Sequence, residues 1–206
     1  MGDPRHGVSG GSGGSRRAFV AAFAGGGTAA LIASCGGGSS KTKSTDTVST
    51  AQADSDAAIL NALLDQEHSS IAAYALIATK LHGPALADAQ RFAGHERRHA
   101  DALGRAISRL GGTVIPPRPQ QEYASGFPRL RGERDALSFS LDVETTAIAA
   151  YSDALGKIAT DAVRATCAAI LVTESEHAAV VLGDLGRPQV PEPFVTGPPP
   201  VGTDTP

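Results

Sequence analysis

LDQEHSSIAAY at residues 64–74 returns as LDVETTAIAAY at residues 141–151, an offset of 77 residues. A second pair of motifs, ERRH at residues 96–99 and ESEH at residues 174–177, is offset by 78 residues. Each copy therefore carries a lone glutamate followed, 29 or 30 residues later, by a Glu-x-x-His pair. Both motifs repeat in the same order, and their offsets differ by only one residue, which indicates a duplicated helical hairpin.

Apolar residues recur at spacings of three and four in four segments, which predicts four helices. These segments are residues 60–81, 89–110, 137–158 and 163–185. None of them shows the sustained alternation of apolar and polar residues that a strand requires. The expected fold class is all-α, and the foldable region, residues 55–186, has a size typical of one domain.

The lengths of the connections predict the topology. Helices one and two are joined near Gly83-Pro84, and helices three and four near Thr160-Asp161. Such short connections make antiparallel neighbours. The proline-rich stretch between helices two and three, residues 111–134, can run along a bundle about 35 Å long at roughly 3 Å per residue. We therefore expect a four-helix bundle with one long crossover between helices two and three.

Six side chains that can bind metal fall on the apolar stripes of these helices. An ionised carboxylate in a bundle core costs several kcal/mol unless it is paired or binds a metal. No Lys or Arg shares these stripes, so the positive charge must come from another source. Two divalent cations balance four carboxylates, and each neutral imidazole adds a nitrogen ligand. The predicted metal ligands are Glu67, Glu96, His99, Glu144, Glu174 and His177.

The six predicted ligands also agree in their level along the bundle. In each hairpin, the lone glutamate and the Glu-x-x-His pair lie at nearly equal distances along the helix axis from the short turn. At 1.5 Å rise per residue these distances differ by only about 3 Å. Residues three apart share a helix face, so Glu96 and His99 can bind one metal, as can Glu174 and His177. The alternative is a set of surface glutamates that form salt bridges and are periodic by chance.

The complete order Glu, Glu-x-x-His, Glu, Glu-x-x-His resembles the ferritin-like superfamily of di-iron and di-manganese carboxylate proteins. The resemblance covers the whole foldable region. It implies a ferritin-like bundle that binds two divalent metals, Fe or Mn, and reacts with dioxygen or peroxide. It also implies that Glu96 and Glu174 bridge the metals, while Glu67 and Glu144 are terminal ligands.

Other polar residues near the stripes have weaker assignments. Tyr74 and Tyr151 lie two turns after a lone glutamate, where each either donates a hydrogen bond to a ligand carboxylate or fills core space. His95 lies one turn before a predicted ligand, so a supporting role beside the metals is open. Cys167 is expected to be a small core residue. The side chains of His68, Arg97, Arg98 and Glu176 are expected to point away from the stripes.

The N-terminal residues 1–35 resemble a bacterial twin-arginine export signal that ends in a lipoprotein lipobox. Arg16-Arg17 precedes a weakly apolar stretch, and LIASC ends at Cys35, the expected lipidation site. These features predict an extracytoplasmic protein anchored to the cell membrane by lipid. The alternative is a Gly/Ser-rich start with an incidental arginine pair. Residues 36–54 are expected to form a flexible linker, and residues 187–206 a proline-rich tail whose first half can pack on the bundle.

The leading functional hypothesis is a membrane-tethered di-metal protein that oxidises Fe(II) or removes peroxide at the cell envelope. Ferroxidase, peroxidase and manganese-catalase-like activities all fit. The alternative is a non-enzymatic envelope scaffold or stress protein with a structural or absent metal site, as in the desiccation-associated ferritin-like families that the chain also resembles. A net charge of −3 without a basic patch gives no sign of nucleic-acid binding. Whether two chains form a homodimer stays open.

Overall fold

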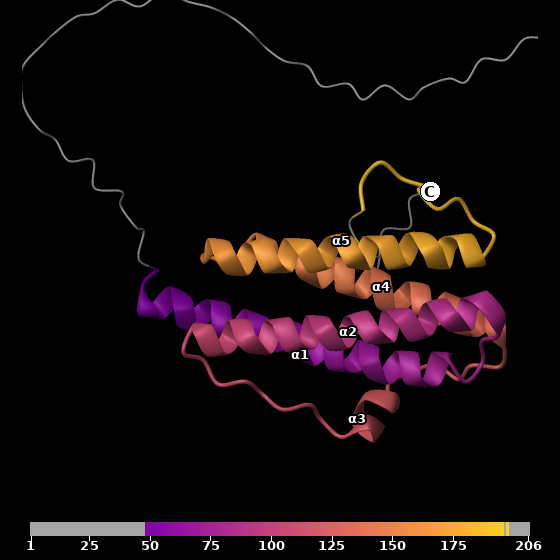
Figure 1. Ribbon diagram of the computed structural model, residues 1–206, viewed down its shortest axis with the longest axis horizontal. Helices are drawn as coiled ribbons and strands as arrows, with labels where there is room; N and C mark the ends of the chain where they lie inside the picture. Colours follow the sequence, from indigo (N-terminus) through magenta and orange to yellow (C-terminus); the bar gives the residue numbers. More distant parts are fainter. Residues whose placement is uncertain (1–47, 196, 198–206) are drawn as a thin grey trace, which may run out of the picture. The chain divides into compact units, whose positions relative to one another are not determined.

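The computed structural model describes residues 48–195 and 197 of the 206-residue chain. Within that part the protein has five helices and no strand, which confirms the all-α prediction (Figure 1). The expected export signal and lipidation site at Cys35 lie outside the described residues. The helices are α1 (Thr50–Ile77), α2 (Gly83–Arg109), α3 (Gln120–Ala124), α4 (Glu133–Leu155) and α5 (Asp161–Asp184).

The four long helices form two antiparallel hairpins, α1–α2 and α4–α5, joined by the long crossover (Figure 1). The crossover runs back along the bundle, so α2 and α4 point the same way, while α1 and α4 are antiparallel neighbours. This is the predicted ferritin-like topology. One feature differs from prediction, because the crossover contains the short helix α3 and is not wholly irregular.

The helix ends also differ from prediction in two places. The linker was expected to extend to residue 54, whereas α1 begins at Thr50, because Ser49 and Gln52 form a capping box. The Ser49 hydroxyl accepts from the Gln52 N–H at 3.3 Å, and the Gln52 side chain accepts from the Ser49 N–H at 3.0 Å. The first helical segment was expected to reach residue 81, whereas α1 ends at Ile77; Gly83-Pro84 begins α2, which agrees with the tolerance of proline in the first helical turn.

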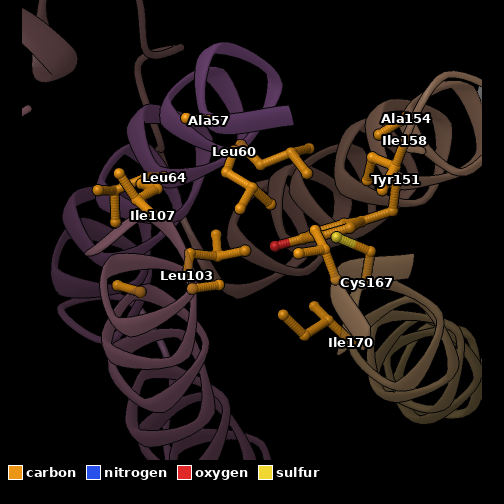
Figure 2. Close-up of a cluster of buried hydrophobic side chains, with 14 residues drawn as sticks. Ala57, Leu60, Leu64, Leu103, Ile107, Tyr151, Ala154, Ile158, Cys167 and Ile170 are labelled. Carbon is orange, nitrogen blue, oxygen red and sulfur yellow. The ribbon is translucent and has the colours of Figure 1, made fainter. Parts of the chain in front are cut away.

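Two apolar clusters fill the bundle, one toward each end. In the first, Leu60 of α1, Leu103 of α2, Tyr151 of α4 and Cys167 of α5 point toward one another (Figure 2). Full burial of one such aliphatic side chain stabilises the fold by about 1.5–3 kcal/mol. The second cluster includes Phe92. On every long helix the predicted metal ligands lie in sequence between the residues of the two clusters, so a polar layer separates them.

The crossover is held on α1 by two polar side chains one helical turn apart. The Asn61 amide donates to the carbonyl of Thr113 and accepts from the N–H of Ile115, both at 2.9 Å. The Asp65 carboxylate accepts two hydrogen bonds from Arg118, at 3.1 and 2.8 Å, and one from Tyr123 of α3 at 2.7 Å. These bonds explain why the proline-rich crossover and α3 are fixed against the bundle.

The tail and α5 each carry apolar residues at the surface. Val190 and Phe194 are 80% and 79% exposed, so the expected packing of the tail on the bundle through these side chains is wrong. The helix α5 is long and apolar enough to cross a membrane by length and composition. Its buried face packs in the bundle and carries Glu174 and His177, which identifies it as a core helix.

Candidate metal centre

The six predicted ligands meet in the middle of the bundle. Glu67 projects from α1, Glu96 and His99 from α2, Glu144 from α4, and Glu174 and His177 from α5. The four carboxylate residues are at most 1% exposed. Among the described residues, these carboxylates are paired with histidines and with no Lys or Arg. The burial of all four excludes the alternative of surface salt-bridging glutamates.

The ligand atoms fall into two overlapping groups. Glu67, Glu96, His99 and Glu174 place one ligand atom each within 4.8 Å of one another, and so do Glu96, Glu144, Glu174 and His177. Two residues, Glu96 and Glu174, belong to both groups. A carboxylate has two oxygens, so each of these residues can offer one oxygen to each group. The arrangement is compatible with two adjacent metal positions that share two carboxylates.

Both histidines turn Nδ1 toward the carboxylates. The Nδ1 atom of His99 lies 2.9 Å from Glu174 and 3.5 Å from Glu96. The Nδ1 atom of His177 lies 3.3 Å from Glu144 and 3.4 Å from Glu96. Each imidazole thus contacts carboxylates from two or more helices at a single nitrogen, as a metal ligand would.

Several buried polar atoms in this layer have no hydrogen-bond partner. They are Glu67 Oε2, both carboxylate oxygens of Glu96, Glu174 Oε1 and His99 Nδ1. His99 Nδ1 and Glu174 Oε1 are close, at 2.9 Å, but their mutual direction does not make a hydrogen bond. A buried polar atom without a partner costs about 1–3 kcal/mol. Divalent cations bound among these atoms would satisfy all of them, so the donor set fits a di-metal site.

Burial acts differently on the four carboxyl groups. It raises the pKa of Glu144 to about 8 and the pKa of Glu67 well above its ordinary value of 4.5. For Glu96 burial also favours the neutral form, but the two site histidines, whose Nδ1 atoms lie 3.5 and 3.4 Å from its oxygens, outweigh burial and lower the pKa to about 2. The same histidines lower the pKa of Glu174 despite burial. Without metal, burial therefore favours the protonated form of the two lone glutamates, while the site histidines favour the ionised form of Glu96 and Glu174.

The site histidines complete the charge balance. Burial alone would lower the pKa of His99, but the surrounding carboxylates raise it to about 12. The same competition raises the pKa of His177 to about 11. With both histidines and both lone glutamates protonated, two imidazolium cations face two carboxylates and the cluster is neutral. Two divalent cations in place of four protons would leave the net charge of the cluster unchanged.

The two tyrosines cross between the hairpins. Tyr74 of α1 donates a hydrogen bond to Glu144 of α4, and Tyr151 of α4 donates one to Glu67 of α1. Both side chains are at most 1% exposed. Tyr74 and Tyr151 also belong to the two apolar clusters, so each tyrosine both fills core space and donates a hydrogen bond. Each lone glutamate is oriented by the tyrosine of the other repeat, because α1 and α4 are antiparallel neighbours.

His95 lies directly behind one site histidine. Its Nδ1 atom is 2.8 Å from Nε2 of His177, and the two rings are stacked with centroids 5.1 Å apart. Phe92 stacks on the same imidazole, with centroids 4.0 Å apart. Sequence reasoning left a supporting role for His95 open and missed the Phe92 contact, since both depend on the approach of α2 to α5.

The remaining residues near the stripes are outside this layer. Arg97, Arg98 and Glu176 are exposed, as predicted, whereas His68 is partly buried beside the crossover. Cys167 is fully buried, and burial raises the pKa of its thiol to about 11, which agrees with a core role.

One buried acid was missed by sequence reasoning. Asp56 lies on the same face of α1 as Glu67, three turns earlier, and is fully buried. Its carboxylate accepts from the N–H groups of Ala159 and Thr160 at 2.9 and 2.8 Å. It therefore fixes the turn between α4 and α5 against α1 and lies outside both ligand groups.

Comparison with known families places this geometry in context. Residues 55–186 match the ferritin-like domain family. The chain belongs to that family. The ferritin-like chain also resembles a solved structure, that of a conserved hypothetical protein, rv2844, from Mycobacterium tuberculosis. The TM-score is 0.57 at 17% sequence identity, over 64% of this chain and 97% of that one, so the likeness concerns the fold alone. No curated protein matches the chain.

Proposed function

We propose that this ferritin-like protein binds two divalent metal ions, Fe or Mn, and uses them to oxidise Fe(II) or remove peroxide. The observation that carries the proposal is the pair of overlapping ligand groups with buried oxygens that lack partners. Carboxylate-rich, imidazole-poor donor sets suit Fe(II) and Mn(II). When bound, such metals supply the electrons that reduce dioxygen or peroxide.

The residues divide into three roles. Glu67 with His99, and Glu144 with His177, would each serve one metal, while Glu96 and Glu174 would serve both. Tyr74 and Tyr151 hold the terminal carboxylates through their hydroxyl groups. The apolar clusters on either side exclude water from the layer.

Among the six ligands, His99 is the most accessible to solvent. Its side chain is 11% exposed, whereas the side chains of the other five ligands are at most 3% exposed. A small reactant such as peroxide or a ferrous ion would approach past this imidazole.

Peroxide consumption and Fe(II) oxidation test the proposed activity. The double variant Glu96→Ala, Glu174→Ala should lose both metals and all turnover above free-metal controls. Glu176→Ala is the matched control, because Glu176 is exposed on the same helix as Glu174. Equal turnover in the double variant and the wild type would refute the proposal. Bound metal without turnover would support a non-enzymatic scaffold instead.

We also propose that the protein is exported and tethered to the cell membrane through Cys35. The support is the order of sequence elements within residues 1–35, namely an arginine pair, a weakly apolar stretch and LIASC. Cys35→Ser should release the protein from the membrane fraction and abolish labelling by radioactive palmitate. Replacing Arg16 and Arg17 with lysine should retain it in the cytoplasm. Export and labelling that survive these changes would refute the tether.

A further inference from the structure

The two halves of the metal centre are not equivalent around their histidines. Behind His177 stands His95, 2.8 Å from its Nε2 atom. The position that matches His95 in the other repeat, by the offset of 78, is Thr173. The Thr173 hydroxyl donates to the carbonyl of Ala169 in its own helix and so gives His99 no comparable partner.

A partner on the outer nitrogen decides how an imidazole binds metal. A metal-bound imidazole needs a lone pair on the binding nitrogen and carries its proton on the other. His177 turns Nδ1 toward Glu144 and Glu96, so its proton would be on Nε2, where His95 Nδ1 can accept it. Loss of such an outer partner typically lowers metal affinity by about 10–100-fold. His95 therefore favours the binding tautomer of His177.

Packing and exposure add to the same difference. Phe92 stacks on the His177 ring, and the matching position in the other repeat is the aliphatic Ile170. The His177 side chain is 3% exposed and the His99 side chain 11%. The His177 imidazole is thus contacted by His95 at its edge and by Phe92 on its face, whereas the His99 imidazole lacks both contacts and is more exposed to solvent.

We propose that the metal position at His177 binds first and tightly, with His95 as its positioning residue, and that the position at His99 binds later and exchanges. This inference rests on the proposed function, since it requires that both positions bind metal. It assigns the exchangeable position to the side of the site where reactants enter. The duplicated hairpins thus supply similar ligands to two unequal positions.

Stepwise titration of the full chain with Mn(II), without oxygen, tests the inference. Wild-type protein should bind two ions in two resolved steps, at least tenfold apart in dissociation constant. His99→Ala should remove the weaker step, and His177→Ala the tighter one. The opposite assignment would overturn the inference, as would two equal steps in the wild type. A wild type that binds no Mn(II) and no Fe(II) would refute the proposed function itself.

Variants at the two matched positions test the role of His95. His95→Leu should weaken the tight step about 10–100-fold and leave the other unchanged. His95→Gln, whose amide oxygen can accept the same proton, should recover most of that loss. Thr173→Val is the matched control and should change neither step. Melting of the metal-free variants checks that each folds. Equal weakening of both steps by His95→Leu, or no rescue by His95→Gln, would overturn the positioning role.

Discussion

Metal binding at this site should release protons, and their number follows from the structure. Without metal at neutral pH, Glu144 holds a proton with a pKa of about 8, and burial also raises the pKa of Glu67. His99 and His177 hold protons with pKa values of about 12 and 11. Metal ligands must be deprotonated. Binding of two divalent ions should therefore release about three protons, from Glu144, His99 and His177, and a fourth to the extent that Glu67 is protonated.

This number sets the pH dependence of affinity. Each released proton contributes about 1.4 kcal/mol per pH unit to the binding free energy. With about three to four protons, the overall constant for two metals should rise about 10³- to 10⁴-fold per pH unit near neutrality. The sign is positive, because raising the pH favours the deprotonated ligands. The slope should become smaller above about pH 8, where Glu144 loses its proton without metal.

Calorimetric titration with Mn(II) in buffers of different ionisation enthalpy measures the proton count directly. The variant Glu67→Gln, Glu144→Gln removes two of the titrating groups and should release about one to two protons fewer if it still binds metal. Glu176→Ala, in which an exposed carboxylate is lost, should behave like the wild type. Release of fewer than two protons by the wild type, or an affinity independent of pH, would refute the protonated cluster described above.

Three further outcomes follow. Tyr74→Phe leaves a buried oxygen of Glu144 without its hydrogen-bond donor. The free energy of unfolding, measured with urea, should therefore fall by about 1–3 kcal/mol. An unchanged midpoint of urea unfolding would count against that hydrogen bond. Asp65→Ala removes the hydrogen bonds of Asp65 to Arg118 and Tyr123 in the crossover. Because these contacts are partly exposed, the variant should lower the free energy of unfolding by about 1 kcal/mol or less and speed hydrogen exchange in the crossover, with metal content unchanged. Loss of metal in this variant would contradict the separation of the crossover from the site. Without metal, the two site histidines and two lone glutamates have folded-state pKa values above their unfolded ones, so their contribution to stability grows as the pH falls from about 8 toward 6.5. The gap in melting temperature between metal-loaded and metal-free protein should accordingly narrow on acidification in calorimetry, and a widening gap would contradict the assigned protonation states.

The layer of six side chains could be predicted because its ligand pattern occurs in both halves of the repeat. Glu67 and Glu144 each occupy an apolar stripe, and each is followed by a Glu-x-x-His pair at nearly the same distance. Helical periodicity fixes which face a residue occupies, and turn positions fix its height. Face and height together were enough to bring these residues together, without knowledge of the packing between helices.

Features that depend on contacts between elements could not be predicted in the same way. The crossed hydrogen bonds of Tyr74 and Tyr151 require that α1 and α4 be neighbours. The contact of His95 with His177 requires the approach of α2 to α5. The start of α1 is different, because the capping box at Ser49 is a local signal that was present in the sequence and was overlooked in a segment otherwise typical of a linker.

The central claim is that the buried carboxylate layer binds two metal ions. Elemental analysis of the purified, folded chain, produced with iron and manganese both supplied, tests it most directly. The structure predicts close to two metals per chain in the wild type and in Glu176→Ala, and none in the double variant Glu96→Ala, Glu174→Ala. A value near zero for well-folded wild-type protein would contradict the di-metal site.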